Sequence, residues 1–227
     1  MPNKPTRRRS FHSANVAVIG LGRFGSALAL ELVKSGHQVL GIDADEKIVQ
    51  NLAGELTHVL SADTTDEETL RELGLAEMDS AVVAIGADLE SSILTASLLL
   101  QLGVKQVWAK ANSTPHGKIL RQLGVHHVIF PEYEMGRRVA HQVSGESLDY
   151  VHIDEDFVMV KVECPKSFDG QNLADLKIRS TYGVTVVASS HGDGNYTPAF
   201  PETVLHAGDH LVVAGRKQPL DEFCQLD

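Results

Sequence analysis

The 227-residue sequence contains little cysteine and no long apolar run, and these absences exclude several classes of protein. Its two cysteines, Cys164 and Cys224, lie far apart without a closely spaced companion, so they can build neither a disulfide framework nor a cysteine zinc site. The longest apolar stretches, such as residues 93–102, are interrupted by polar residues and do not reach the about 18 residues that a membrane span requires. We therefore expect a reducing, cytoplasmic setting and a chain that does not cross a membrane by itself.

Positive charge is also scarce in this sequence. Lys and Arg number 20 against 30 Asp and Glu, and the net charge of −10 argues against nucleic acid as a partner, because binding to a phosphate backbone needs a basic face. Arg7–Arg9 stand out in the first 14 residues, which lack the apolar segment of a signal peptide. We expect these residues to form a disordered tail whose arginines could contact an anionic membrane surface.

The remaining residues follow the pattern of repeated βαβ units. Apolar residues make up 43% of the chain and charged residues 22%, as in an ordinary soluble protein, and the length suits one medium and one small domain. Short apolar runs alternate with longer segments of helical period, several of which close on glycine. The predicted strands are 16–19, 39–42, 58–60, 81–85, 106–109 and 127–130, and the predicted helices are 24–35, 46–54, 66–73, 89–102 and 115–123. This order predicts an α/β fold, a Rossmann-like doubly wound parallel sheet with helices on both faces.

The pattern changes after residue 131. Residues 132–144 form a further helical stretch that no strand follows directly. From Tyr150 the apolar residues alternate with period two, and turn residues gather at 192–195. We therefore predict a tail over 1–14, a doubly wound domain over 15–131, a connector over 132–149 and a small α+β domain over 150–227.

Residues 20–25 (GLGRFG) place the motif G-x-G-x-x-G directly after a predicted strand and at the start of a predicted helix. In that context Gly20 permits a tight turn, Gly22 lets a pyrophosphate approach the backbone, and Gly25 lets the helix pack close to the strand. Asp43 follows about 20 residues later, where a carboxylate accepts hydrogen bonds from ribose hydroxyls. The alternative is a plain tight turn with Asp43 as a helix cap. The agreement of spacing, strand and acid favours a site for an adenosine nucleotide, whose phosphates bind at the helix N-terminus.

The sequence leaves open which adenosine nucleotide this loop binds. Arg23 lies in the loop itself, as do the candidate residues Leu21 and Phe24, and its guanidinium could reach a terminal phosphate. In a dinucleotide the second phosphate is already esterified. This position slightly favours ATP or ADP over NAD(H). Arg23 could equally be solvated beside the helix.

Further candidates follow later strands, at the edge where open α/β sheets bind their ligands. Asp63 and Thr64 could border the adenine, unless this segment only caps the following helix. Ile85 and Gly86 come from the end of the fourth predicted strand. Lys110, at the tip of the fifth, would add positive charge near the phosphates.

Glu132 is the unusual candidate, because phosphates repel a carboxylate. It belongs in the site only if Mg²⁺ or another divalent cation bridges it, or if it pairs with Arg23 when the third phosphate is absent. The alternative is an exposed glutamate at a helix start.

A nicotinamide dehydrogenase would need a general acid–base above the cofactor, and the sequence offers no obvious one. His126 and His127 are adjacent in a strand and point to opposite faces. His206 and His210 have a ligand-like spacing, but no third His or Cys completes a motif and the residues between them predict a hairpin turn. We therefore do not expect an enzyme, and an NAD(H)-binding oxidoreductase or NAD(H)-sensing module stays as the alternative.

Four segments together resemble the RCK (KTN) domain, the regulator of potassium conductance. They are residues 18–25 (VIGLGRFG), 84–88 (AIGAD), 107–111 (VWAKA) and 131–136 (PEYEMG). Residues 170–179 and 205–215 resemble the small C-terminal domain of the same family. The chain is most similar to the KtrA-type regulatory subunits of bacterial potassium uptake systems, with Trk-type regulators next.

The resemblance implies homodimers, formed through the crossover helix, that assemble as a homo-octameric ring beneath a transmembrane potassium-translocating subunit. Exchange of ATP for ADP would change the ring and gate that subunit, which places the chain in the cytoplasm at the inner face of the cell membrane. It also implies that Arg23 reads the third phosphate and that Glu132 joins a cation site across the dimer. Asp43 would hold the ribose, and Asp63 would lie against the adenine.

Members of this family can also carry a second ligand in the C-terminal domain. Several members of the family bind cyclic di-AMP around the positions of Ile178 and Arg179. Arg179 matches them, but Thr185 stands where some relatives carry asparagine. Cyclic di-AMP is therefore a possible, not an implied, ligand.

Overall fold

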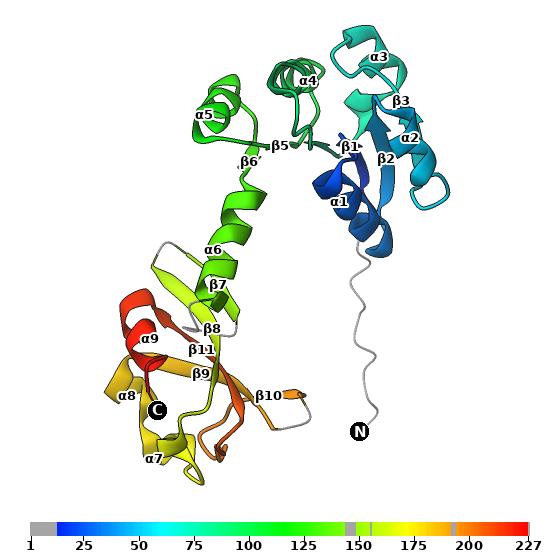
Figure 1. Cartoon of the computed structure of the whole chain (residues 1–227). Helices are drawn as coiled ribbons and strands as arrows, with labels where there is room; N and C mark the ends of the chain where they lie inside the picture. Colours follow the sequence, from blue (N-terminus) through cyan, green and yellow to red (C-terminus); the bar gives the residue numbers. More distant parts are fainter. Residues whose placement is uncertain (1–12, 144–148, 155, 192–193, 227) are drawn as a thin grey trace, which may run out of the picture. The chain divides into compact units, whose positions relative to one another are not determined.

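A computed structural model describes residues 13–143, 149–154, 156–191 and 194–226 (Figure 1). The arginines of the predicted tail, part of the predicted connector and residues 192–193 of the predicted turn lie outside these ranges. The chain divides into two compact units, residues 1–131 and residues 132–227, and each is described by itself.

The first unit is built on a six-stranded parallel sheet in the order β3-β2-β1-β4-β5-β6. Its strands are β1 (Asn15–Ile19), β2 (Gln38–Asp43), β3 (His58–Ser61), β4 (Ser80–Val83), β5 (Val107–Lys110) and β6 (His127–Ile129). The chain order reverses between β1 and β4, and open sheets bind ligands beyond the strand ends at such a point. The predicted doubly wound α/β fold is confirmed, with strand ends that differ from the prediction by one or two residues.

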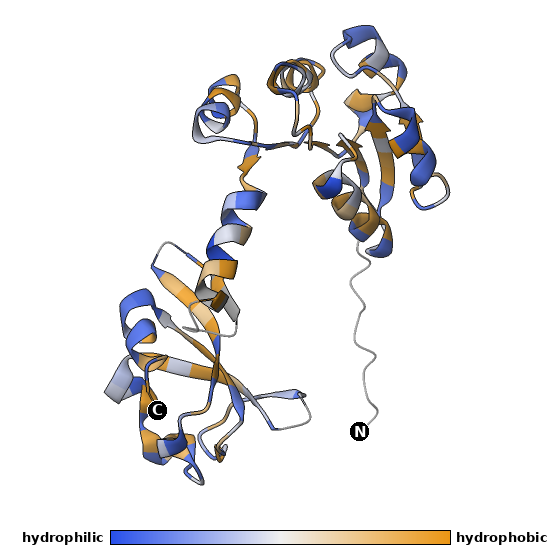
Figure 2. Cartoon of the chain, viewed as in Figure 1, coloured by the Kyte–Doolittle hydropathy of each residue, from blue (hydrophilic) through white to orange (hydrophobic). Residues whose placement is uncertain are grey.

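The helices of this unit cover both faces of the sheet. They are α1 (Arg23–Lys34), α2 (Glu46–Asn51), α3 (Glu67–Glu72), the short η1 (Leu75–Glu77), α4 (Leu89–Gln101) and α5 (Thr114–Leu123). Side chains alternate along β1, so Val16 and Val18 join one core with Ala29 of α1, while Ala17 and Ile19 join another with Leu99 of α4 and Leu120 of α5. Figure 2 shows largely hydrophobic strands in this unit and helices that carry both hydrophobic and hydrophilic residues.

Local chemistry sets where these helices begin and end. Asp45, Asp66, Asp88 and Ser113 each cap a helix by accepting hydrogen bonds from its first N–H groups. Gly36, Gly74, Gly103 and Gly124 follow helices with positive φ, as predicted for glycines past a helix end.

The second unit is a small α+β domain, as predicted. It contains a five-stranded antiparallel sheet in the order β10-β9-β11-β8-β7. The strands are β7 (Asp149–His152), β8 (Phe157–Glu163), β9 (Val184–Ser190), β10 (Tyr196–Pro198) and β11 (His210–Arg216), and the helices are α6 (Pro131–Val143), η2 (Lys166–Phe168), α7 (Leu173–Leu176), α8 (Ile178–Tyr182) and α9 (Lys217–Phe223). Val158, Val160 and Val162 of β8 point into a core that Phe168 and Phe223 complete. The period-two pattern therefore marks the buried face of β8.

None of the helices in the described ranges is both long enough and apolar enough to span a membrane.

Candidate nucleotide-binding site

The loop between β1 and α1 requires glycine at two of its three motif positions. Gly20 has a φ of 89°, and a Cβ there would lie 2.9 Å from the backbone nitrogen of Ile85. A Cβ on Gly25 would lie 1.8 Å from the carbonyl oxygen of Gly20. Side chains are excluded at both positions because α1 packs directly on the loop and the loop packs on the end of β4. The structure thus brings Ile85 against the glycine loop, as the sequence placed both in one site.

Gly22 differs from the other two glycines because the space where its side chain would stand is open. A Cβ there would meet nothing within 4 Å, and Gly22 is the N-cap of α1 without any side-chain hydrogen bond to the helix. The first turn of α1 contains no acidic residue. The first N–H groups of a helix have no partner within it, and the helix dipole favours an anion beside them. The geometry therefore fits a phosphate group that approaches over Gly22.

Asp43, the last residue of β2, holds this loop in place. Its Oδ2 accepts a hydrogen bond from the backbone N–H of Leu21 at 2.6 Å, and its Oδ1 accepts one from the N–H of Asp45 at 2.9 Å. Each carboxylate oxygen has a second lone pair, so Asp43 can still accept hydrogen bonds from ribose hydroxyls. Sequence reasoning weighed Asp43 as a ribose acceptor or a helix cap and missed that the same side chain fixes the loop.

Lys110, at the end of β5, lies beside the loops that follow β1 and β4. Its side chain is buried, its Nζ lies 5.9 Å from the ring centre of Phe24, and a Cβ on Gly86 would lie 3.4 Å from that Nζ. These distances allow a cation–π contact with Phe24. The structure therefore brings together three predicted site residues from three different strand ends and places a positive charge among them.

Asn112 is a residue of this edge that sequence reasoning missed. Its side-chain amide donates a hydrogen bond to the carbonyl oxygen of Gly86, which ties the loop after β5 to the loop after β4. Its own N–H donates to Nδ1 of His116 at 3.3 Å, and burial lowers the pKa of that histidine. An amide side chain three residues past the predicted strand 106–109 is the signal that could have identified this brace.

The segment after β3 divides into an exposed and an internal residue. Asp63 is exposed, and its Oδ1 accepts hydrogen bonds from the N–H and hydroxyl of Thr65, which lower the pKa of the carboxyl group. Thr64 is 6% exposed, and its hydroxyl bonds that of Thr95 in α4 at 3.0 Å. Asp63 is thus open to a ligand, whereas the side chain of Thr64 braces the loop from inside. The adenine contacts predicted for both remain predictions.

The other predicted residues lie at helix starts. Arg23 is the first residue of α1 and is exposed. Glu132 lies in the first turn of α6, in the second unit, so its part in the site stays a prediction. In α8, Ile178 packs in the core of the second unit while Arg179 is exposed. If cyclic di-AMP binds there, Arg179 is the side chain that can reach it.

A Rossmann-like unit with an open glycine loop, followed by a small antiparallel α+β unit, defines a class of two-domain nucleotide-binding proteins. Comparison with known families agrees: residues 16–131 match the TrkA-N domain and residues 157–226 match the TrkA-C domain. The chain belongs to the TrkA-N/TrkA-C family, which confirms the resemblance seen in the sequence.

Relatives of nearly the same length include potassium uptake proteins. The chain is 37% identical over 209 residues to Ktr system potassium uptake protein A of Bacillus subtilis, which covers 91% of this chain and 94% of that protein. It is 37% identical over 205 residues to the protein of the same name from Vibrio alginolyticus, covering 90% and 93%.

Solved structures share the fold. The GsuK RCK domain superposes with a TM-score of 0.66 at 18% identity and covers 100% of this chain, which in turn spans half of that chain. The GsuK channel bound to NAD gives a TM-score of 0.64 at 18% identity over 93% of this chain and 39% of that one. GsuK bound to ADP gives 0.52 at 16% identity, covering 62% and 40%.

Proposed function

We propose that this chain is a regulatory subunit that binds an adenine nucleotide and thereby controls a transmembrane potassium-translocating subunit. The observation that carries the proposal is the 37% identity, over 91% of the chain, to a Ktr system potassium uptake protein. The open approach over Gly22 and the Asp43 carboxylate at the loop support nucleotide binding. Such a subunit acts at the inner face of the cell membrane through its partner and catalyses no reaction of its own.

The regulatory signal is the exchange of ATP for ADP. Both nucleotides make the same contacts to Asp43 through the ribose, and contacts of equal strength shift no equilibrium. Only groups near the third phosphate can distinguish the two. Arg23 at the start of α1 and Lys110 beside Gly86 are suitably charged, and Glu132 would act with Mg²⁺ or another divalent cation. The coupling free energy between nucleotide binding and a conformational change is typically about 1–3 kcal/mol per site. A ring that changes shape in concert adds the contributions of several sites.

An NAD(H)-sensing module is the second candidate function. The observation that favours it is the solved GsuK channel bound to NAD, whose fold this chain shares. The same glycine loop and Asp43 would hold the adenosine half of that cofactor. In that case Arg23 would not discriminate between ligands.

The assembly we propose is a homodimer that builds a homo-octameric ring. Exposed apolar side chains support an interface between copies, because a lone soluble chain gains nothing from them. On α6 they are Tyr133, Met135, Val139 and Val143; on α5, Ile119 and Leu123; on α4, Leu89 and Leu94, which line an open depression. Cyclic di-AMP near Arg179 would be a second signal read by the C-terminal domain.

Potassium flux tests the proposed function. The tag-free chain is reconstituted in proteoliposomes with the potassium-translocating subunit of its own organism, and uptake is measured with ATP or with ADP. We expect the two nucleotides to give different uptake rates, and Arg23→Ala to remove the difference while ADP binding, followed by calorimetry, stays nearly intact. Equal rates with the wild-type chain would contradict the proposal. An equal loss of affinity for both nucleotides in the variant would contradict the role of Arg23.

A further inference from the structure

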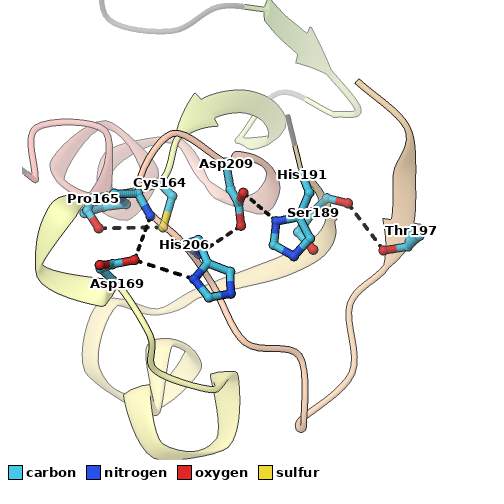
Figure 3. A network of polar contacts seen from close by, with 9 residues as sticks. Cys164, Pro165, Asp169, Ser189, His191, Thr197, His206 and Asp209 are labelled. Carbon is cyan, nitrogen blue, oxygen red and sulfur yellow. Dashed lines mark hydrogen bonds and ion pairs between the residues drawn. The ribbon is translucent and has the colours of Figure 1, made fainter. Parts of the chain in front are cut away.

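Two histidines and two aspartates form a compact polar cluster in the second unit, whereas the glycine loop belongs to the first (Figure 3). His191 directly follows β9, His206 and Asp209 belong to the turn that precedes β11, and Asp169 directly follows η2. In the sequence His206 has a ligand-like spacing to His210, but the fold brings His206 beside His191, which is distant in sequence. The rings of His191 and His206 lie 5.1 Å apart between centres and are inclined by 45°.

Asp209 fixes the orientation of His191. The Asp209 side chain is 5% exposed, and its Oδ1 lies 2.6 Å from Nδ1 of His191. Its Oδ2 accepts a hydrogen bond from the backbone N–H of His206 at 2.9 Å. An ionised carboxylate can only accept, so the proton of the short contact belongs to Nδ1 of the imidazole. In neutral His191 the lone pair is therefore on Nε2.

Asp169 places a carboxylate near the ring of His206 without a hydrogen bond to it. Its Oδ1 lies 3.6 Å from Nδ1 of His206 and accepts a hydrogen bond from the N–H of Ala207 at 3.0 Å. The negative charge beside Nδ1 favours the proton on that nitrogen, which again leaves the lone pair on Nε2. The two histidine side chains are 63% and 52% exposed, so a solute can reach both rings.

We propose that Nε2 of His191 and Nε2 of His206 together bind one divalent transition-metal ion, with Zn²⁺ as the best match. A carboxylate that accepts from the other ring nitrogen is the usual second partner of a metal-binding histidine, because it fixes the tautomer and makes the ligand more basic. His191 has such a carboxylate in Asp209, and His206 has the Asp169 carboxylate at ion-pair distance from its Nδ1. Imidazole nitrogen suits Zn²⁺, Ni²⁺ and Cu²⁺ and is a poor ligand for Mg²⁺ or Ca²⁺.

The protein supplies part of the coordination shell of this ion. In the described ranges, no group of three or more His, Cys, Asp or Glu side chains is arranged to hold a metal, so water completes the shell. Cys164 is excluded as a third ligand, because its thiol is buried and its Sγ–H points to the carbonyl oxygen of Pro165 at 3.6 Å. An ion bound in this way would join the end of β9 to the turn before β11.

Calorimetric titration tests the site. The full-length, tag-free chain is freed of metal with a chelator, dialysed and titrated with ZnCl₂. We expect one ion per chain, and a loss of affinity of about tenfold or more in His191→Gln and in His206→Gln, because each change removes one imidazole ligand. His58→Gln is the matched control, since His58 is an exposed histidine of the first unit and should leave the titration unchanged.

Two results would overturn the site. Unchanged Zn²⁺ affinity in the double variant His191→Gln/His206→Gln, with circular dichroism confirming its fold, would place the ion elsewhere. Nitrogen NMR of the metal-free chain gives the second test, because it reports which ring nitrogen carries the proton. We expect the Nδ1–H tautomer at His191; the Nε2–H tautomer there would contradict the proposed arrangement.

Discussion

Gly22 and Gly25 of the β1–α1 loop differ in the space that is available for a side chain. A Cβ on Gly25 would collide with the carbonyl oxygen of Gly20, whereas a Cβ on Gly22 would stand in open space. Packing thus requires Gly25, whereas at Gly22 we propose that the open space serves the phosphate of a nucleotide. Sequence spacing predicted both positions, and the structure supplies the reason for each.

Alanine substitutions separate these two roles. We expect Gly25→Ala to destabilise the first unit by on the order of 3 kcal/mol, because backbone must move to admit the methyl group. Gly22→Ala should change stability by less than about 1 kcal/mol, since the N-cap of α1 uses no side chain, yet it should weaken nucleotide binding by about tenfold or more because the methyl group occupies the phosphate approach. Urea unfolding and calorimetric titration measure the two effects. Equal stability of both variants would refute the packing argument.

Cys164 illustrates a residue whose environment suppresses its chemistry. Burial raises the pKa of its thiol to about 11, and the neighbouring Asp209 and Asp169 add to the effect. Because the pKa in the folded state lies above the ordinary value of 9.0, this thiol favours folding below about pH 9, and the contribution is lost as the pH rises toward 11.

We therefore expect iodoacetamide at pH 8 to leave Cys164 unmodified in the native chain, because almost none of it is thiolate. Cys224, which is only partly buried, is the internal comparison and should react first. Peptide mass spectrometry after timed alkylation gives both rates. Modification of native Cys164 as fast as in urea would show that the burial argument is wrong.

At the scale of elements, sequence pattern predicted the order and type of most helices and strands because each has a clear period and a chemical end signal. It was weaker where one residue type serves two purposes. Aspartate and threonine after a parallel strand can bind a ligand or cap the next helix, and the sequence does not reveal which way the side chain points. Asp88 turned out to cap α4, and Thr64 to bond Thr95 inside the unit.

The Thr64–Thr95 contact couples the loop after β3 to α4, and a double-mutant cycle can measure it. We expect Thr95→Val to cost about 1–3 kcal/mol, because it leaves both the buried Thr64 hydroxyl and the Thr64 carbonyl oxygen without their partner. Thr64→Val should cost less, because the Thr95 hydroxyl still donates to the Thr64 carbonyl oxygen. The double variant should cost less than the sum, by about 1 kcal/mol, since no hydroxyl is then left unpaired. Urea unfolding of the four proteins gives the values. Strict additivity would mean that the two hydroxyl groups do not interact.

At the scale of the whole molecule, composition and the change of period at about residue 131 predicted two domains of different architecture. The pairing of His191 with His206 was beyond sequence reasoning, because it depends on how β9 and β11 lie in one antiparallel sheet. The role proposed for Glu132 depends on the proposed assembly of copies, which no local pattern encodes. We therefore propose that function divides between the units, with nucleotide recognition in the first and a metal site in the second.

Calorimetric titration of the nucleotide-stripped, full-length chain with ADP, ATP and NADH, with and without Mg²⁺, tests the central claim most directly. We predict that ADP and ATP bind, that Mg²⁺ strengthens the ATP signal, and that Gly22→Ala weakens both. A clear preference for NADH would instead favour the NAD(H)-sensing function. Absence of nucleotide binding, or ADP binding that Gly22→Ala leaves unchanged, would contradict the assignment of the glycine loop as the nucleotide site.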